Sequence, residues 1–482
     1  MSTNPAVVNS STGETRHALI LAVLAIAGTT FALLQAIVVP ALPNIARALG
    51  TTSSGAAWIL TVNLLSTAVL TPILGRAGDI LGKERVLSGV MVALAGGTLV
   101  CALAPSLPVM LAGRAIQGAG GAVYPLAFGI VRDLFPRERI AGAIGLVSSL
   151  LGIGAGLGLI VPGFILEGLS YHWLFWLPLA VLAVTTPLTI VCVPRSPVRT
   201  AASINWGSAA LMATGLAGLL VAVSEATAWG WGSPKTVGLF ACAAALVAIW
   251  IRRELRSHEP LVDMRMMATR AVWTTNLAAF LLGVGMYASI AVIPALVELP
   301  RSSGVGFGGT AVAAGLFMLP TAAMQLLIGP YTGRIERRLG SRTQLQAGMA
   351  AVLVAYVVLF DAHATTLELL AATVVLGLGL GLGLSSLANL IVAAVRQDQT
   401  GVATGVNTVM RTLGGAFGAQ IATTFITASA HHGLPTDQGF TLAFGVCAGA
   451  LVVGLLSAMI VPRSSGRGRV AEATVVAAGQ SA

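Results

Sequence analysis

The sequence contains very little charge. Only 9% of its 482 residues are Asp, Glu, Lys or Arg, against about 25% in an ordinary soluble domain, while 56% are hydrophobic. A soluble protein of this length needs a charged surface, and this chain lacks the residues to make one. The composition therefore excludes a soluble globular protein and predicts a membrane protein whose surface is largely covered by lipid.

Cysteine is also scarce, and its pattern is not that of a disulfide framework or a zinc site. The four cysteines lie singly in apolar stretches, without any CxxC pair: Cys101, Cys192, Cys242 and Cys447. We expect them to pack as small residues between helices. His431 and His432 have no other ligand types nearby, so we expect neither a metal nor another cofactor.

A nucleotide-binding lysine motif is missing, which argues against an ATP-driven pump. Glycines alternate at 152–158 and 377–383, but both runs lie inside apolar stretches rather than after a strand. The 57 glycines are better explained by close packing of membrane helices. The net charge of +10 is spread over many short segments, so no nucleic-acid partner is expected.

Long apolar runs fill the chain instead. A helix needs about 20 apolar residues to cross the roughly 30 Å of hydrocarbon. Fourteen segments meet this requirement: 18–41, 56–74, 86–104, 107–131, 140–166, 174–193, 206–227, 235–251, 271–297, 309–330, 343–360, 366–394, 402–428 and 439–461.

The basic residues predict the orientation of these spans. With the N-terminus inside, only Arg47, Lys235 and Arg301 of the 27 Lys and Arg residues fall outside, and Arg114 and Arg411 fall within spans. The other 22 are cytoplasmic, as the positive-inside rule requires. We therefore predict a multi-pass protein of the cell membrane with both termini in the cytoplasm.

Two residue patterns recur along the chain. Gly75, Arg76 and Gly82 recur at an offset of 258 as Gly333, Arg334 and Gly340. A second pattern recurs at an offset of 260: Ala143, Gly145, Gly154 and Gly158 match Ala403, Gly405, Gly414 and Gly418. The repeat predicts two six-helix halves of the same orientation, the architecture of alternating-access transporters.

This repeat divides the chain into five parts. The predicted parts are a cytoplasmic tail (1–17), a first six-helix bundle (18–200), two inserted helices with their linker (201–262), a second six-helix bundle (263–461) and a second cytoplasmic tail (462–482).

Residues 18–461 resemble the major facilitator superfamily, and specifically its fourteen-helix drug:proton antiporter branch. The loop after the second span matches the superfamily's signature at Gly75, Asp79, Gly82, Lys83 and the neighbouring Arg85. The fourth span matches the branch's RxxQGxG pattern at Arg114, Gln117, Gly118 and Gly120. The resemblance implies an all-α transporter, not an enzyme, which acts as a monomer and exports drug-like or antibiotic-like molecules, by proton antiport.

The sequence departs from the family pattern at two places. The family's first span usually carries an aspartate, where this chain has Leu34 with Gln35 beside it. That acid is linked in the family to cationic drugs, so neutral or anionic cargo is expected here. In the fifth span Leu159 replaces an expected proline, and Pro162 follows three residues later.

Two arginines lie deep in the predicted spans. Arg114 and Arg411 are each roughly 12 Å from a helix end, where a charge costs about 2.5–3.5 kcal/mol. Either they face a central cavity and act in cargo binding or proton movement, or they are paired and hold helices together. The repeat places Thr373 at the position equivalent to Arg114.

Asp79 is the expected gate residue. It lies at the cytoplasmic end of the second span beside Arg76, Lys83 and Arg85. A charge pair near a helix N-terminus would close the inner side in one conformation. The alternative is a solvated loop acid.

Polar and small residues inside the spans have two expected roles. We expect the polar side chains to line the central cavity: Gln35, Asn63, Gln117 and Asn407, with Tyr124 and Tyr287 as further candidates. The glycines expected in helix packing are Gly118, Gly154, Gly158, Gly414 and Gly418.

The acid that would carry the proton is not evident. No acidic residue lies deep in a predicted span, and Glu225, Glu298 and Asp361 fall near outer helix ends. Proton antiport therefore rests on the resemblance alone, with Asp79 or one of these three as carrier. Two rivals to drug export remain: a transporter of a lipid, nutrient or endogenous metabolite, and a membrane-embedded enzyme or sensor.

Overall fold

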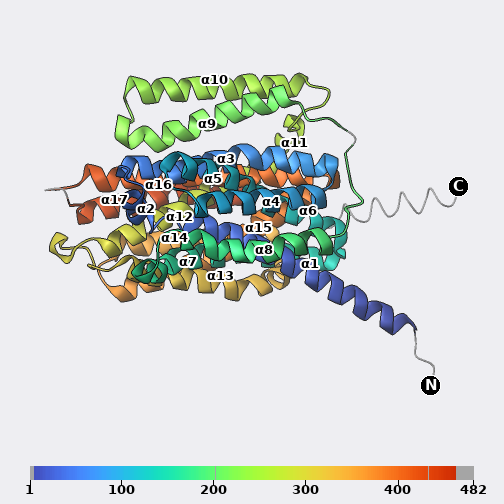
Figure 1. The fold of residues 1–482 in the computed structure, drawn as a ribbon, viewed down its shortest axis with the longest axis horizontal. Helices are drawn as coiled ribbons and strands as arrows, with labels where there is room; N and C mark the ends of the chain where they lie inside the picture. Colours follow the sequence, from blue (N-terminus) through green and yellow to red (C-terminus); the bar gives the residue numbers. More distant parts are fainter. Residues whose placement is uncertain (1–4, 201, 432–433, 463–482) are drawn as a thin grey trace.

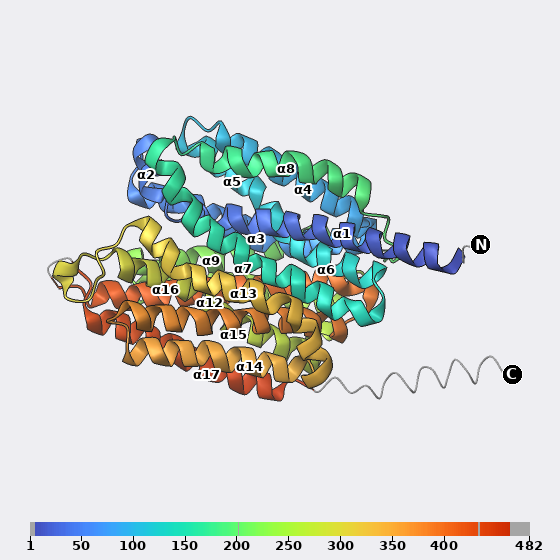
Figure 2. The ribbon, with the colours of Figure 1, turned by 90° about the horizontal axis from the view of Figure 1, so that it is seen from below.

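The computed structural model describes residues 5–200, 202–431 and 434–462, and almost all of them are helical. The first group of helices comprises α1 (Pro5–Ala36), α2 (Leu42–Ala48), α3 (Ser53–Leu81), α4 (Lys83–Ala102), α5 (Leu107–Gln117), η1 (Gly118–Ala122), α6 (Val123–Leu134), α7 (Arg137–Gly168) and α8 (Trp173–Cys192). These helices pack together and are called the first bundle (Figure 2).

The rest of the chain forms a hairpin and a second bundle. The hairpin is α9 (Trp206–Trp229) and α10 (Pro234–Arg256), followed by α11 (Met264–Met267). The second bundle comprises α12 (Arg270–Glu298), η2 (Arg301–Ser303), α13 (Ala311–Leu339), α14 (Ser341–Asp361), α15 (Thr366–Ala394), η3 (Gln397–Gln399), α16 (Thr400–Ala428) and α17 (Asp437–Ile460).

Twelve of the helices in the described part of the chain are long and apolar enough to cross a membrane, rather than the fourteen predicted. The all-helical, multi-pass class is confirmed. The two predicted spans missing from the twelve are 107–131 and 402–428. The second of these is the single 29-residue helix α16.

The segment predicted as a fourth continuous span is instead divided into α5, η1 and α6. The interruption is the GAGGA sequence of η1, which forms a 3-10 helix because three glycines in five residues weaken the α-helix. A methyl group at Gly118 would lie 2.0 Å from the Ser66 hydroxyl, and one at Gly121 would lie 2.4 Å from the Thr71 hydroxyl. The glycines therefore let this segment contact α3 directly.

Several helices are capped by hydroxyl side chains at their N-terminal ends, on the side of the molecule away from the chain termini. Thr52, Ser233 and Thr310 each accept a hydrogen bond from a backbone N–H of the first turn of α3, α10 and α13. At α15 the cap is reciprocal, because Thr365 and Glu368 form a capping box. These caps satisfy N–H groups that a helix otherwise leaves unpaired.

The hairpin α9–α10 lies along one side of the two bundles (Figure 1). Helix α9 packs across α3 of the first bundle and α16 of the second. Leu220 of α9 contacts a small apolar cluster of Ala68 from α3 and Val409 and Leu413 from α16. The hairpin therefore covers the line along which α3 meets α16.

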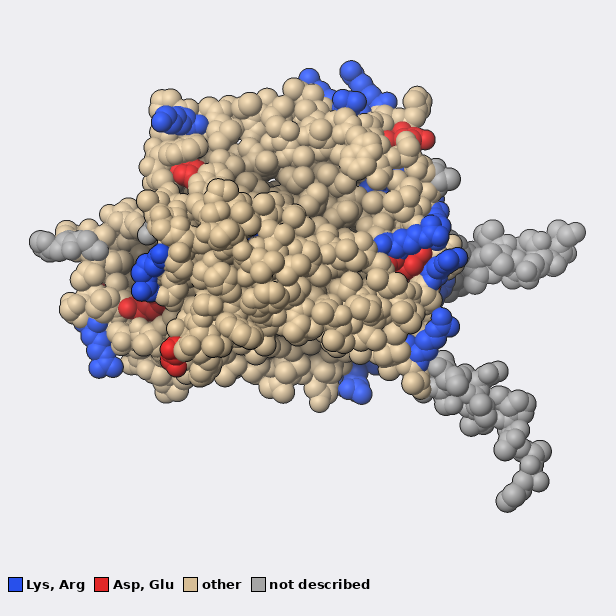
Figure 3. Space-filling model, viewed as in Figure 1, with Lys and Arg blue, Asp and Glu red and all other residues tan. Residues whose placement is uncertain are grey.

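Charged side chains gather at the two ends of the molecule, and the band between them is uncharged on the face shown in Figure 3. Both ends of the described chain lie at the same end of the helices, called the termini end below. Exposed leucines on the flanks, such as Leu327 at 61%, belong to this band. This is the surface of a protein that spans a membrane.

Repeated glycines bring helix backbones into contact in both bundles. Gly154 and Gly158 of α7 face the backbone of α1, and Gly414 and Gly418 of α16 face the backbone of α12. A methyl group at Gly414 would lie only 1.9 Å from the Phe280 carbonyl oxygen. Four of the predicted packing glycines thus lie where neighbouring backbones leave no room for a side chain.

Replacing Gly414 by Ala is expected to destabilise the protein by about 1–3 kcal/mol, because the added carbon meets backbone atoms that a side-chain rotation cannot move aside. The measurement is the thermal unfolding midpoint of the purified protein in detergent. Gly89→Ala is the matched control, since nothing lies within 4 Å of a methyl group there. Equal midpoints for the two variants would contradict the packing role.

Candidate functional site

At the termini end, Asp79 of α3 joins the first bundle to the second. Its Oδ1 accepts a hydrogen bond from the Gly401 N–H at 3.0 Å, and its Oδ2 accepts one from the Val402 N–H at 2.9 Å. These donors belong to the first turn of α16, where N–H groups lack partners in the helix and the helix dipole favours an anion. The carboxylate is fully buried, so the predicted gate acid is not solvated.

The glycines of the same motif explain how the two helices come so close. A methyl group at Gly75 would lie 2.4 Å from the Gly401 carbonyl oxygen, so only glycine allows this approach. Gly82, between α3 and α4, has φ +106°, a conformation that residues with side chains rarely adopt. The Arg85 side chain is exposed.

Lys83 balances the buried acids. Its Nζ donates to the Asp133 Oδ2 at 2.7 Å and lies 3.8 Å from the Asp79 Oδ1, and all three side chains are fully buried. Asp133 also accepts a hydrogen bond from Gln397 of the second bundle at 3.1 Å. One lysine therefore lies within reach of two carboxylates, both of which bind across the bundle interface.

Arg132 makes the complementary contact to the C-terminal end of α15. Its guanidinium donates to the Val395 carbonyl at 2.8 Å, the Arg396 carbonyl at 3.2 Å and the Thr400 hydroxyl at 2.7 Å. The last carbonyls of a helix are unpaired and attract a cation. The first bundle thus places the carboxylate of Asp79 at the start of α16 and the guanidinium of Arg132 at the end of α15.

The segment between α8 and α9 crosses beneath these contacts. The Thr200 N–H donates to the Asp79 carbonyl at 2.7 Å, and the Thr200 hydroxyl donates to the Asp398 carbonyl at 2.9 Å. Ser196 donates to Asp133 at 2.5 Å. Arg132, Asp133 and this segment were not predicted from the sequence. The one sequence feature that marks the two residues is a pair of adjacent opposite charges at the end of a helix.

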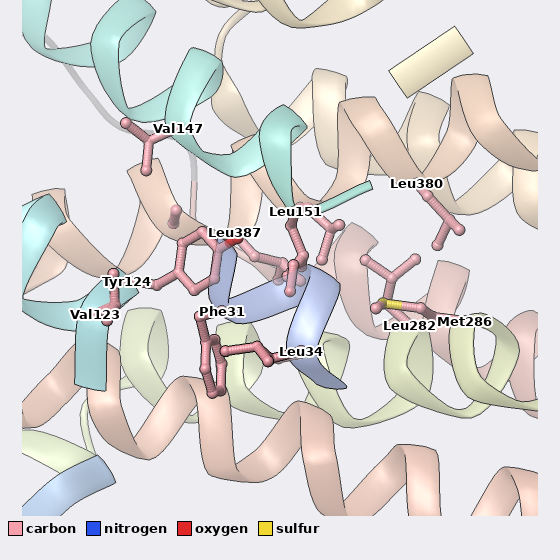
Figure 4. Packing of buried hydrophobic residues seen from close by; sticks show 14 of the residues in the cluster. Phe31, Leu34, Val123, Tyr124, Val147, Leu151, Leu282, Met286, Leu380 and Leu387 are labelled. Carbon is pink, nitrogen blue, oxygen red and sulfur yellow. The ribbon is translucent and has the colours of Figure 1, made fainter. Parts of the chain in front are cut away.

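A small cavity lies in the middle of the molecule, between α6 and α7 of the first bundle and α15 and α16 of the second. Tyr124 and Leu151 face Leu387 across it, within a tightly packed apolar region (Figure 4). The space left is about 20 Å³, enough for a single water molecule. A pocket that holds a drug-sized ligand needs about 300 Å³ or more, so the bundles are closed on each other here.

Arg411 and Asn407 are the site residues that line this cavity. The Arg411 Nε is buried without a hydrogen-bond partner, and such a group costs free energy until an acceptor reaches it. Asn407 donates to the Asn276 Oδ1 of α12 at 2.9 Å, which fixes its orientation. Tyr124 also lines the cavity, and its hydroxyl donates to the Gly28 carbonyl at 2.9 Å.

Arg114 lies elsewhere, inside the first bundle. It is only 1% exposed and does not line the central cavity. Its guanidinium donates to the carbonyls of Ile59 and Leu34 at 3.2 and 3.0 Å and to the Gln117 Oε1 at 2.8 Å. These neutral acceptors tie α1, α3 and α5 together. At the position where the family usually carries an aspartate, the backbone carbonyl of Leu34 therefore accepts a hydrogen bond from Arg114.

Three polar residues expected in the cavity likewise lie outside its lining. Asn63 donates to the Arg114 carbonyl at 3.1 Å, and Gln117 donates to the Thr98 hydroxyl at 2.9 Å. Gln35 is half-buried on α1. Asn63 and Gln117 form hydrogen bonds with polar groups inside the first bundle. Side chains held in this way do not face the central cavity.

The second bundle repeats one of these contacts. The Thr321 hydroxyl donates to the Thr373 carbonyl at 2.9 Å, just as Asn63 donates to the Arg114 carbonyl. The positions differ by 258 and 259, within the range of 258 to 260 given by the sequence repeat. The two bundles therefore share an internal contact as well as a residue pattern, although only the first contains a buried arginine at this place.

One further acid is mostly shielded from solvent and was missed from the sequence. Glu336, near the termini end of α13, accepts hydrogen bonds from Ser341 and Asn389, neither of which is charged. Asn389 also donates to the Ala141 carbonyl of α7 at 3.3 Å, so this acid borders the bundle interface. No group of three metal-ligating side chains occurs among the described residues.

Known proteins resemble this chain over most of its length. It is 27% identical to the multidrug transporter protein MdtP of Bacillus subtilis, over 84% of this chain and 74% of that protein. It is 24% identical to the lincomycin resistance protein LmrB of Listeria monocytogenes, over 87% of this chain and 90% of that protein. An uncharacterised transporter of Mycobacterium tuberculosis is 29% identical over 80% of this chain, but the chain spans only 56% of its length.

The fold has a counterpart among solved structures. The human organic anion transporter MFSD10 superposes with a TM-score of 0.66 at 16% identity, over 91% of this chain and 99% of that one. The sequence model of the Major Facilitator Superfamily matches residues 24–419. This chain therefore belongs to the Major Facilitator Superfamily.

Proposed function

We propose that the protein exports drug-like or antibiotic-like small organic molecules by alternating access, coupled to proton antiport. Membership of a transporter superfamily and relatives named for multidrug transport and lincomycin resistance support the cargo class. The observation that carries the proposal is the joint between the two bundles, which pairs Asp79 with the start of α16 and Arg132 with the end of α15. Such contacts can break and reform as a unit.

We propose fourteen membrane crossings, with the two remaining segments also spanning. The segment α5–η1–α6 begins with Leu107 beside Gly55 of α3 and ends with Leu134 beside His17 of α1. In Figure 2, α5 lies toward the end of the molecule that holds α2, and α6 lies toward the termini end. The first turn of helix α16 is hydrogen bonded to Asp79 of α3. Near its other end, Thr424 accepts a hydrogen bond from the Trp231 indole. The first segment is divided at η1 into helices too short to cross alone, and polar residues lower the hydropathy of α16, yet each segment connects the two ends. The 22 basic residues assigned to one side support cytoplasmic termini.

In this proposal the structure is the state closed toward the cytoplasm. The joint at the termini end consists of charge-assisted hydrogen bonds, each worth about 1.5–3 kcal/mol. Opening that end requires Asp79 to leave α16, Arg132 to leave α15 and the central cavity to widen. Widening would expose the Arg411 Nε to cargo. An acceptor on the cargo would satisfy that N–H, which favours neutral or anionic molecules over dications.

The proton carrier in this scheme is one of a few acids. Asp79 and the outer acids Glu225, Glu298 and Asp361 remain candidates from the sequence. Glu336 joins them because it is held at the bundle interface by neutral partners only. Asp79 differs from Glu336 in its partners, because it lies 3.8 Å from Lys83 and accepts two backbone hydrogen bonds.

Export is tested by expressing the protein in a hypersensitive bacterial host and measuring growth inhibition by a panel of toxic compounds. We expect at least a fourfold rise in the inhibitory concentration for some neutral or anionic antibiotics and little change for dicationic biocides. A proton uncoupler should abolish accumulation differences of a fluorescent substrate. Strong resistance to dications would refute the predicted charge preference, and uncoupler-insensitive efflux would refute antiport.

The gate is tested by Asp79→Asn. An amide oxygen can accept from one of the two N–H donors, but the amide nitrogen then faces the other donor, and the charge opposite Lys83 is lost. We expect efflux to fall by about 10- to 100-fold, the equivalent of one charge-assisted bond, at unchanged protein levels in the membrane. The control is Glu167→Gln, an exposed acid of α7. Wild-type efflux in Asp79→Asn would exclude the gate.

Arg411→Gln tests the cargo contact. Removing the unpaired cation should lower efflux of anionic substrates about tenfold, the loss expected for one hydrogen bond to a charged group, and affect neutral substrates less. Arg252→Gln, an exposed arginine of α10, is the control. Equal losses for anionic and neutral substrates would assign Arg411 to structure rather than recognition.

A further inference from the structure

A second, larger cavity opens at the termini end, on the side of the molecule opposite the hairpin. It has a volume of about 360 Å³ and lies where α1 and α7 of the first bundle meet α13 of the second. We propose that this cavity binds the headgroup of an anionic phospholipid, such as phosphatidylglycerol. The site is distinct from the central cavity and from the contacts of Asp79, and the proposal does not depend on what the protein transports.

The charges around the cavity favour an anion. Arg139 of α7 and Arg334 and Arg337 of α13 line it, together with one acid, Glu138, and with His17 of α1. Among the described residues that line the cavity, arginines therefore outnumber acids. Arginine binds phosphate oxygens through paired N–H groups, which makes it well suited to a phosphodiester.

The rest of the lining is apolar. Leu21 of α1, Phe135 beside the start of α7 and Pro330 of α13 form the apolar part of the wall. The Phe135 ring lies 4.9 Å from the His17 ring, whose Nε2 is 3.2 Å from the Leu134 carbonyl. A free phosphate ion has no use for such a wall, whereas the glycerol and upper acyl carbons of a lipid would cover it.

An exposed apolar stripe leads from the cavity along α13. Leu316, Leu319, Leu327 and Pro330 are all exposed, and they recur at three- to eight-residue spacings, which places them along one flank of the helix. Arg334 ends the stripe, and its guanidinium lies 5.7 Å from the centre of the Tyr331 ring. An acyl chain can therefore lie on the stripe while its phosphate reaches the arginines.

The level of the cavity in the membrane also fits a headgroup. It lies at the first two turns of α7 and the last three turns of α13, toward the charged termini end of the molecule. Basic pockets between membrane helices at this level are typical sites for anionic lipid headgroups. Because Arg139 belongs to one bundle and Arg334 to the other, a bound lipid would bridge them in the conformation described here.

The test is native mass spectrometry of the purified full-length protein with equimolar dioleoyl phosphatidylglycerol and dioleoyl phosphatidylcholine. We expect at least a fivefold preference for phosphatidylglycerol in the wild type. The Arg334→Gln, Arg337→Gln double variant should lose that preference. Arg338→Gln removes a charge from the same turn of α13 but does not line the cavity, so it should keep at least three-quarters of it.

Two outcomes would overturn the proposal. If the Arg338→Gln control loses the preference as fully as the double variant, the effect is one of overall charge. If inorganic phosphate at millimolar concentration competes phosphatidylglycerol away from the wild type, the cavity is a phosphate site rather than a lipid site. Thermal unfolding of each variant checks that folding is intact, and the added lipid should raise the midpoint of the wild type and the control only.

Discussion

The joint between the bundles depends on hydrogen bonds between charged side chains of the first bundle and backbone groups at helix ends of the second. The helix α16 starts with N–H groups that no residue of its own satisfies, and the carboxylate of Asp79 supplies the acceptors from the other bundle. Arg132 does the same for the last carbonyls of α15. In a protein with so few charged residues, the buried side chains of Asp79, Lys83 and Asp133 each bind a helix terminus or another charge.

This arrangement explains why the motif contains glycines as well as charges. Gly75 lets α3 approach Gly401 closely enough for the carboxylate of Asp79, one turn later, to reach the two N–H groups. Lys83 then keeps two buried carboxylates from destabilising the same small region. The glycines and the charges of the motif thus contribute to the same contact between α3 and α16.

The sequence predicted the class and most helices, and it singled out Asp79, because hydropathy, charge patterns and a long-period repeat are properties of the chain itself. It failed where the outcome depends on contacts. The fourth segment read as one apolar run, yet three glycines and the proximity of Ser66 divide it. Arg114 and Arg411 have similar depths in their predicted spans, so the sequence did not separate them. Arg114 is enclosed in the first bundle because two other helices supply the carbonyls of Ile59 and Leu34 as acceptors.

Other parts of the site could not have been found from the sequence at all. Arg132 bonds to residues 263 to 268 positions away, and no local pattern marks such a pair. Glu336 sits among arginines in the sequence and reads as part of a basic cluster, while in the structure it turns toward Asn389. In each case packing of helices from different bundles, rather than local propensity, determines the partner.

The hairpin α9–α10 makes the two flanks of the molecule unequal. The bundles meet along two seams, α3 with α16 and α7 with α13, and the hairpin covers the first through Leu220. The second is bordered by exposed apolar side chains such as Phe164 and Leu327. The acyl chains of the surrounding lipids therefore meet the seam between α7 and α13 directly, whereas at the seam between α3 and α16 they meet the hairpin.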